Sequence, residues 1–99
     1  MHYEIILHPD VTGKDLKELS KVQIALVFKQ FKKLQTFLEL GRPLGNKSGY
    51  DLSGCRKMYV DRKKIRIVYT IQETVITVEV ITVGKREDMA VYQKAAQRR

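Results

Sequence analysis

The sequence predicts an α+β protein built on a small, mostly antiparallel sheet of about four strands. Apolar residues alternate through Cys55–Val60 and Ile65–Ile71, which is the period of a half-buried strand. Through Lys21–Leu40 they recur three and four positions apart, the period of an amphipathic helix. The chain has 99 residues, enough for one hydrophobic core and too few for two, so we expect a single domain over residues 1–99.

The N-terminal segment predicts a strand and then a short helix. Residues of Met1–His8 alternate as in a strand, and Pro9 ends it because proline cannot donate a ladder hydrogen bond. Asp10 stands where an N-cap is expected, ahead of a helical pattern at Lys14–Leu19. This short helix is the first half of a predicted helical hairpin.

The second half of the hairpin is the long helix Lys21–Leu40. Ser20 can cap its start, while Gly41 and Pro43 end it. We expect the two helices to cover one face of the sheet and to leave the other face open. The glycine-rich segment Arg42–Gly54 that follows predicts a loop.

Next, the sequence predicts a hairpin in which residues 61–64 join the strands Cys55–Val60 and Ile65–Ile71. Pairing Val60 with Ile65 makes the two strands agree in polarity, because directly opposed residues point to the same face. One face then carries apolar side chains and the other carries two cations and a phenol. The apolar face consists of Met58, Val60, Ile65 and Ile67, and the second face of Lys57, Tyr59, Arg66 and Val68.

The C-terminal third predicts an interior strand and a short final helix. Thr74–Val83 is apolar on both faces, as expected of a strand with neighbours on each side, and it leads into Gly84-Lys85-Arg86. Asp88 can cap a helix over Met89–Gln97. The last two residues, Arg98 and Arg99, are expected to extend the positive surface.

Charge is the strongest signal in the composition. Nineteen Lys and Arg against eleven Asp and Glu give a net charge of +8, which favours a nucleic acid, an acidic protein or an anionic surface as partner, although a solvated basic surface is the alternative. The apolar runs are too short for a membrane span, and the N-terminus lacks a signal-peptide pattern. One cysteine forms no internal disulfide, which suits the cytoplasm.

We expect neither a metal site nor a cofactor. One cysteine and two histidines do not have the spacing of a zinc site, and no glycine loop has the pattern that cradles phosphates. Cys55 is expected to be a small buried side chain rather than a nucleophile. His2 and His8 are too far apart along one strand, ~20 Å, to act together on one phosphate.

The second face of the hairpin has the residues that RNA chemistry requires. Lys57, Arg66 and Arg86 can contact phosphates, while Tyr59 and Tyr92 can stack on bases. Guanidinium groups stabilise the extra negative charge of a phosphorane, and a lysine crowded by cations becomes a better base. RNA supplies its own nucleophile, the 2′-OH. From the residue pattern alone, a patch that only binds RNA is equally possible.

The segments Lys57-x-Tyr59, Arg66-Ile-Val-Tyr69 and Val83-Gly-Lys-Arg86-Glu with Val91-Tyr92 resemble the RelE branch of the RelE/ParE toxin superfamily. The resemblance extends over essentially the whole chain. It implies a RelE-like microbial ribonuclease fold and a toxin that cuts mRNA in the ribosomal A site, with the 2′-OH attacking the adjacent phosphate. It also implies a cognate antitoxin as partner, through which the complex binds operator DNA.

The resemblance assigns roles to individual residues. Lys57 matches a general base, Arg66 the arginine that stabilises the phosphorane, and Arg86 the arginine at the leaving 5′ oxygen. Tyr92 matches a tyrosine that stacks on an mRNA base. Tyr59 departs from the family, which has a second lysine there. Contacts to mRNA and ribosomal RNA are expected from other basic residues: Lys47, Arg56, Arg62, Lys63, Lys64 and Lys85.

Two other hypotheses remain open. A ParE-like toxin would share the fold and inhibit DNA gyrase without cutting RNA, but such proteins generally lack the set Lys57, Arg66, Arg86 and Tyr92. An inactive relative would survive as a binding module or co-repressor.

Overall fold

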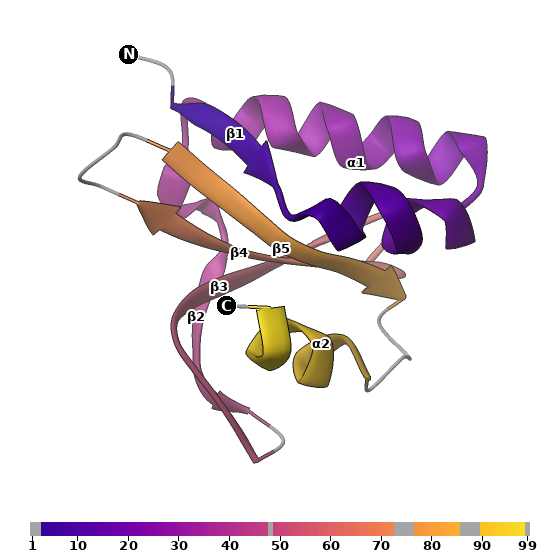
Figure 1. Cartoon of the computed structure of the whole chain (residues 1–99). Helices are drawn as coiled ribbons and strands as arrows, with labels where there is room; N and C mark the ends of the chain where they lie inside the picture. The colour runs from indigo at the N-terminus through magenta and orange to yellow at the C-terminus, as the bar shows by residue number, and fades with distance from the viewer. Residues whose placement is uncertain (1–2, 48, 73–76, 86–89, 99) are drawn as a thin grey trace.

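The structure is a computed structural model that describes residues 3–47, 49–72, 77–85 and 90–98. Its described strands form one five-stranded sheet with helical segments on both faces (Figure 1). The order is β1-β5-β4-β3-β2, and β1 runs parallel to β5 while the other neighbours are antiparallel. The strands are β1 (Glu4–Leu7), β2 (Arg42–Lys47), β3 (Tyr50–Val60), β4 (Ile65–Gln72) and β5 (Thr77–Lys85). The α+β class is confirmed, with one strand more than expected.

The predicted loop Arg42–Gly54 is wrong, because most of it is strand. Arg42–Lys47 forms β2 and pairs with β3, which begins at Tyr50 rather than at Cys55. Proline is tolerated here because β2 is an edge strand with one row of backbone groups unpaired. The pairing is irregular between Pro43 and Gly45, where a positive φ of 69° suits glycine.

The predicted register of the β3–β4 hairpin is confirmed. Val60 lies opposite Ile65, and Tyr59 lies opposite Arg66. The connecting turn has three consecutive residues in the left-handed region, with φ of 53° to 68° from Asp61 to Lys63. Each such non-glycine residue is costly, so the surrounding structure must hold the turn in this form. The predicted interior position of the last strand is also confirmed, since β5 lies between β1 and β4.

The N-terminal helical hairpin is present, with a short and irregular first half. Val11–Asp15 (η1) is a π-helical turn, and Leu16–Glu18 (η2) is a 3-10 turn. The second half is α1 (Lys21–Leu34), in which Ser20 and Gln23 form a reciprocal capping box. The predicted cap at Ser20 is therefore confirmed, whereas Asp10 makes no side-chain cap.

Helix α1 ends at Leu34, six residues before the predicted end at Leu40. Gly41 is not its terminator: its φ of −80° is one that any residue adopts. A glycine is needed there because a Cβ would lie 2.6 Å from the Lys57 carbonyl oxygen and 2.8 Å from the Tyr69 hydroxyl. Gly41 N–H donates to that hydroxyl at 2.9 Å. This close approach fixes the path of the chain from helix to β2.

Each face of the sheet has its own core, so the expectation of an open second face is wrong. The hairpin η1, η2 and α1 covers one face, and α2 (Ala90–Arg98) packs on the other (Figure 1). The core between the sheet and α2 is a separate cluster of buried residues: Leu52, Cys55, Val68 and Ile81 from the strands, with Val91, Tyr92 and Ala95 from α2. The predicted cap Asp88 and the predicted start of the helix lie outside the described residues.

Arg98 does not extend the positive surface as expected. Its guanidinium binds the buried Asp15 carboxylate through two nitrogens, at 2.7 and 3.1 Å, and also donates to the Ile81 carbonyl at 3.0 Å. Asp15 accepts a further hydrogen bond from Val83 N–H at 2.9 Å. This network ties α2, β5 and η1 together. None of the described helices is long and apolar enough to cross a membrane.

Candidate active site

Three of the predicted site residues come together because of the hairpin register. Lys57 and Tyr59 alternate along β3, and Arg66 on β4 lies directly opposite Tyr59. All three therefore project from the same face of the sheet. Tyr92 approaches from α2 on that side. These four residues form what we call the cationic–aromatic cluster.

Cations and rings alternate within the cluster. The Lys57 ammonium donates to the Tyr59 hydroxyl at 3.2 Å and lies 5.4 Å from the centroid of its ring. The Arg66 guanidinium carbon is 5.7 Å from the Tyr59 ring centroid and 4.3 Å from that of Tyr92. These distances are within the ~6 Å reach of cation–π attraction. The rings therefore help to hold two like charges close together.

The Arg66 side chain is buried without full hydrogen bonding. The residue is 6% exposed, and its Nε and one terminal nitrogen have no hydrogen-bond partner among the described residues. Burying a charged donor without a partner is expensive, so such groups are rare in native proteins. Such donors are suited to binding an anion.

The surroundings of Tyr59 change its proton affinity. Burial of its phenol acts to raise the pKa. The hydrogen bond from Lys57, hydrogen bonding to Arg66 and the positive charges of both outweigh burial and lower the pKa of Tyr59 from 10.0 to about 8. The phenolate is thus within reach near neutral pH.

Gly84 lets α2 bring Tyr92 close to the sheet. Gly84 lies opposite Arg66 on β5, and a Cβ at this position would be 2.6 Å from Cγ2 of Val91. Tyr92, the next residue, is only 3% exposed because its ring faces the Arg66 guanidinium. The Val-Gly-Lys segment recognised in the sequence therefore has a packing role as well as a position beside the cluster.

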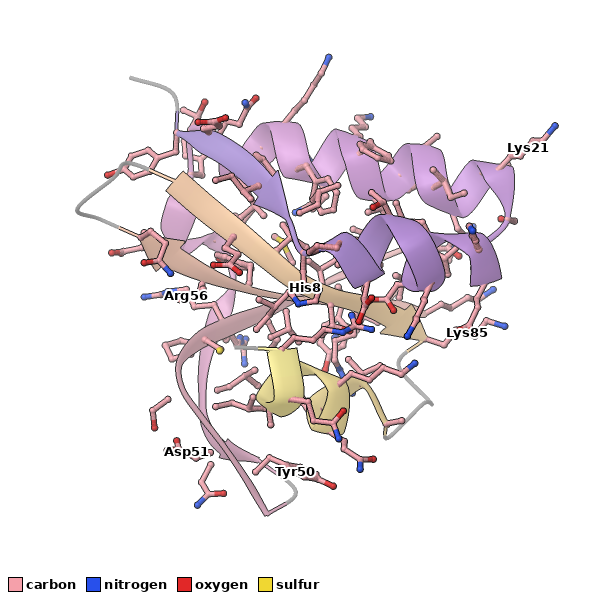
Figure 2. The ribbon with its side chains drawn as sticks, viewed as in Figure 1. His8, Lys21, Tyr50, Asp51, Arg56 and Lys85 are labelled. Atoms are coloured by element: carbon pink, nitrogen blue, oxygen red, sulfur yellow. The ribbon has the colours of Figure 1, made fainter. Side chains whose placement is uncertain are left out.

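The other predicted site residues do not form one patch. Arg86 and the side chain of Lys47 lie outside the described residues. Arg56 donates to the Gly41 carbonyl at 2.8 Å, and it lies on the opposite side of the molecule from the exposed Lys85 (Figure 2). In the β3–β4 turn, Arg62, Lys63 and Lys64 are all exposed.

A groove beside the cluster contains residues that the sequence did not single out. It has a volume of about 530 Å³ and runs between α1, the start of β2 and the β3–β4 turn. Its lining residues are Gln30, Lys33, Leu40, Arg42, Lys57, Met58, Tyr59 and Lys63. Arg42 fell in the segment predicted to be a loop, and Lys33 was one of several lysines on the predicted amphipathic helix. The sequence did not show that the two residues line one groove.

The cysteine and the described histidine make contacts that belong to the fold. Cys55 is buried in the core under α2, as expected. His8 Nδ1 accepts from the Asp10 N–H at 3.1 Å, while His2 lies outside the described residues. Among the described residues, no three His, Cys, Asp or Glu side chains lie close enough together to hold a metal ion.

Comparisons with known proteins find one family and a group of related folds. The model of the family described as "ParE toxin of type II toxin-antitoxin system, parDE" matches residues 5–90. No curated protein sequence matches the chain.

Several solved structures share the fold. A doubly substituted E. coli toxin RelE in the free state superposes with a TM-score of 0.78 at 22% identity, over 99% of this chain and 98% of that one. The RelBE2 toxin-antitoxin complex from Mycobacterium tuberculosis gives 0.69 at 24% identity, over 87% and 100%. The substituted E. coli RelE in complex with a peptide of its antitoxin RelB gives 0.64 at 26% identity, over 100% and 99%.

Proposed function

The chain belongs to the ParE toxin family of type II toxin-antitoxin systems, and from this membership and the cationic–aromatic cluster we propose that it is an endoribonuclease toxin. Its substrate is mRNA in the ribosomal A site, and its action blocks translation in the cytoplasm. The observation that carries the proposal is the buried Arg66 guanidinium, which lies beside the Lys57–Tyr59 pair and has two nitrogens without a partner among the described residues. A phosphodiester placed against them would supply the missing acceptors.

The reaction uses the nucleophile of the RNA itself. The 2′-OH gives its proton to a base and attacks the adjacent phosphorus, forming a phosphorane that carries additional negative charge. Arg66 donates to the phosphorane oxygens, where preorganised donors typically contribute about 10²–10³ in rate. The bond to the 5′ oxygen then breaks and leaves a 2′,3′-cyclic phosphate. Arg86, by its resemblance to the family arginine, protonates or stabilises the leaving oxygen.

We assign the base to Tyr59 rather than to Lys57. The Lys57 ammonium donates its hydrogen to the phenol oxygen, which favours the phenolate over the phenol. With a pKa of about 8, Tyr59 has a useful deprotonated fraction near neutral pH and remains basic enough to accept a proton. Lys57 then acts by position and charge. Tyr92, stacked against Arg66, holds the guanidinium in place.

An antitoxin is the proposed partner. RelB bound to RelE in solved complexes supports this assignment, and the net charge of +8 favours an acidic partner. A shallow apolar groove of about 260 Å³ between β1 and α1 is lined by Ile5, Leu7, Phe28 and Phe31, and it offers a surface for an amphipathic segment. Operator DNA would be bound through the antitoxin.

Primer extension on mRNA after induction tests the proposal, with and without ribosomes in a purified system. We expect cleavage within the A-site codon only when ribosomes are present. Tyr59→Phe should abolish cleavage and growth arrest, because the hydroxyl that accepts the proton is lost. Antitoxin binding should be retained, because the ring remains. Full toxicity of Tyr59→Phe would contradict the assignment.

The second candidate is inhibition of DNA gyrase without RNA cleavage, which the ParE name of the family favours. A supercoiling assay with purified gyrase separates the two functions. Inhibition by wild type and Tyr59→Phe alike, with intact mRNA, would support the gyrase hypothesis.

A further inference from the structure

The groove beside the cluster is lined by several cations. Four of its lining residues are cationic, and none of the described lining residues is acidic. The cations come from separate parts of the chain: Lys33 from α1, Arg42 from β2, Lys57 from β3 and Lys63 from the turn. Taken singly, Lys33 and Lys63 are ordinary surface lysines. Their convergence on one groove is a property of the fold.

Two of these cations are placed against each other at a cost. Arg42 lies directly opposite Lys57 in the β2–β3 pairing, so both side chains project from the same face. Like charges directly opposite each other on neighbouring strands are destabilising. An anion between or above them removes the repulsion.

The groove exists because β2 ends its pairing with β3 at this point. Beyond Lys57, the segment Met58–Val60 has no register partner on β2. The groove therefore opens where the sheet edge is uncovered. On its far side, Lys63 stands in the turn whose residues have left-handed backbone conformations. Strained backbone of this kind tends to occur where a side chain must be aimed.

Lys57 and Tyr59 belong both to the groove and to the cationic–aromatic cluster, so the two sites are continuous. The groove also contains groups that suit a base: the amide of Gln30 and the side chain of Leu40, which is 49% exposed. Its volume of about 530 Å³ is within the ~300–1,000 Å³ typical of ligand sites.

We propose that this groove binds single-stranded RNA next to the cleaved bond, with Lys33, Arg42 and Lys63 contacting the phosphates of the flanking nucleotides. The inference rests on the proposed nuclease function and adds the path of the substrate. The strand leaves Lys57 and Tyr59 along the uncovered edge of β3 and passes beneath the C-terminal end of α1. Ribosomal RNA has the same phosphate chemistry and is the competing occupant.

The test measures binding of 2′-O-methyl RNA, which cannot be cut because its nucleophile is blocked. Fluorescence anisotropy compares a dinucleotide spanning only the cleaved bond with an oligonucleotide extended on both sides. The variant is Lys33→Ala with Arg42→Ala, which leaves the catalytic residues in place. The matched control is Lys17→Ala with Lys21→Ala, which removes the same charge from exposed positions, with Lys21 at the opposite end of α1 (Figure 2).

We expect the groove variant to lose affinity for the extended strand and to bind the dinucleotide as the wild type does. The slope of log affinity against log salt should fall by about 1.4, because each contact to a single-strand phosphate contributes about 0.7. The control variant should keep the wild-type slope. Equal losses in both variants, or on both oligonucleotides, would mean that only general charge was removed, and the inference would be wrong.

Three further outcomes separate the proposals. If the groove variant binds the extended strand normally but binds ribosomes weakly, the groove holds ribosomal RNA and the flanking-strand assignment fails. If wild-type protein cuts A-site mRNA but the groove variant binds the extended strand as tightly as wild type, the nuclease function stands and this inference falls. If the wild type binds the extended strand through the groove but cuts no RNA, the nuclease proposal fails by itself.

Discussion

The side chains of two arginines are largely buried, and their surroundings differ. Arg98 has a carboxylate partner at 2.7 and 3.1 Å and a backbone carbonyl at 3.0 Å. Arg66 lies between the rings of Tyr59 and Tyr92, with two nitrogens that have no partner among the described residues. Both side chains lose hydration on burial. Arg98 replaces it with hydrogen bonds to Asp15 and Ile81, whereas two nitrogens of Arg66 have no such bond among the described residues.

This difference separates a structural charge from a functional one. Arg98 and Asp15 join elements that are 83 residues apart in the chain, so their pairing contributes to holding α2 in place. Arg66 makes cation–π contacts, which keep the guanidinium oriented while its donors remain available. Stability alone would favour an apolar side chain at Arg66. Its two nitrogens without a partner among the described residues are therefore the feature that points to a ligand.

Substitution of each arginine by methionine should lower the free energy of unfolding far more at Arg98 than at Arg66. Arg98→Met leaves the Asp15 carboxylate buried without its cation, and breaking a buried pair typically costs about 3–5 kcal/mol. Urea denaturation followed by circular dichroism measures the loss. A change smaller than about 1 kcal/mol would show that the pair behaves like an exposed one.

Arg66→Met should have the opposite effect: activity falls while stability is nearly unchanged. We expect the free energy of unfolding to change by no more than about 1 kcal/mol, since replacing incompletely paired buried charge by an apolar group is often neutral or stabilising. A-site cleavage should fall by about 10²–10³ through loss of donors to the phosphorane. Strong destabilisation of Arg66→Met would assign Arg66 to the structural class.

Lys57→Gln tests how Lys57 controls the proton affinity of Tyr59. It removes a hydrogen bond and a positive charge that lower the pKa of Tyr59, so this pKa should rise from about 8 toward 10. The midpoint of the cleavage rate against pH should then move upward. Ultraviolet absorbance of tyrosinate, corrected with Tyr59→Phe, measures the same shift without activity. Identical titrations in wild type and Lys57→Gln would contradict the coupling.

Linkage gives the sign of the accompanying change in stability. Because the folded pKa of Tyr59 lies below its unfolded value, the unfolded chain binds more protons between about pH 8 and 10. Folding stability from this group is therefore fully present above the unfolded pKa and is lost as pH falls through the folded pKa. In Lys57→Gln, the free energy of unfolding should therefore depend less on pH between about 8 and 10.

The smallest effect is expected at Asp10, the outer carboxylate near Arg98. Its oxygen is 3.7 Å from Arg98 Nε, and its side chain is 40% exposed. Exposed pairs contribute about 0–1 kcal/mol, so Asp10→Ala should change the free energy of unfolding by less than 1 kcal/mol. A loss as large as that of Arg98→Met would mean that Asp10, and not Asp15, holds the guanidinium.

Local pattern was enough for the hairpin that carries the candidate site. Alternation of apolar and polar residues permits only one register between β3 and β4, since a slip of one residue would turn every side chain to the wrong face. Lys57, Tyr59 and Arg66 therefore converge for a reason that is readable in the sequence. The amphipathic period likewise identified α1 and its cap at Ser20.

Contacts between segments that are far apart in the sequence could not be predicted from local patterns. The sequence does not show that Gly41 meets Tyr69, so the end of α1 and the strand β2 were missed. It shows a C-terminal arginine but not its buried partner Asp15. It shows the cations of the groove but not their convergence. Periodicity records how one element faces the core, whereas only the packed chain decides which groups from different elements meet.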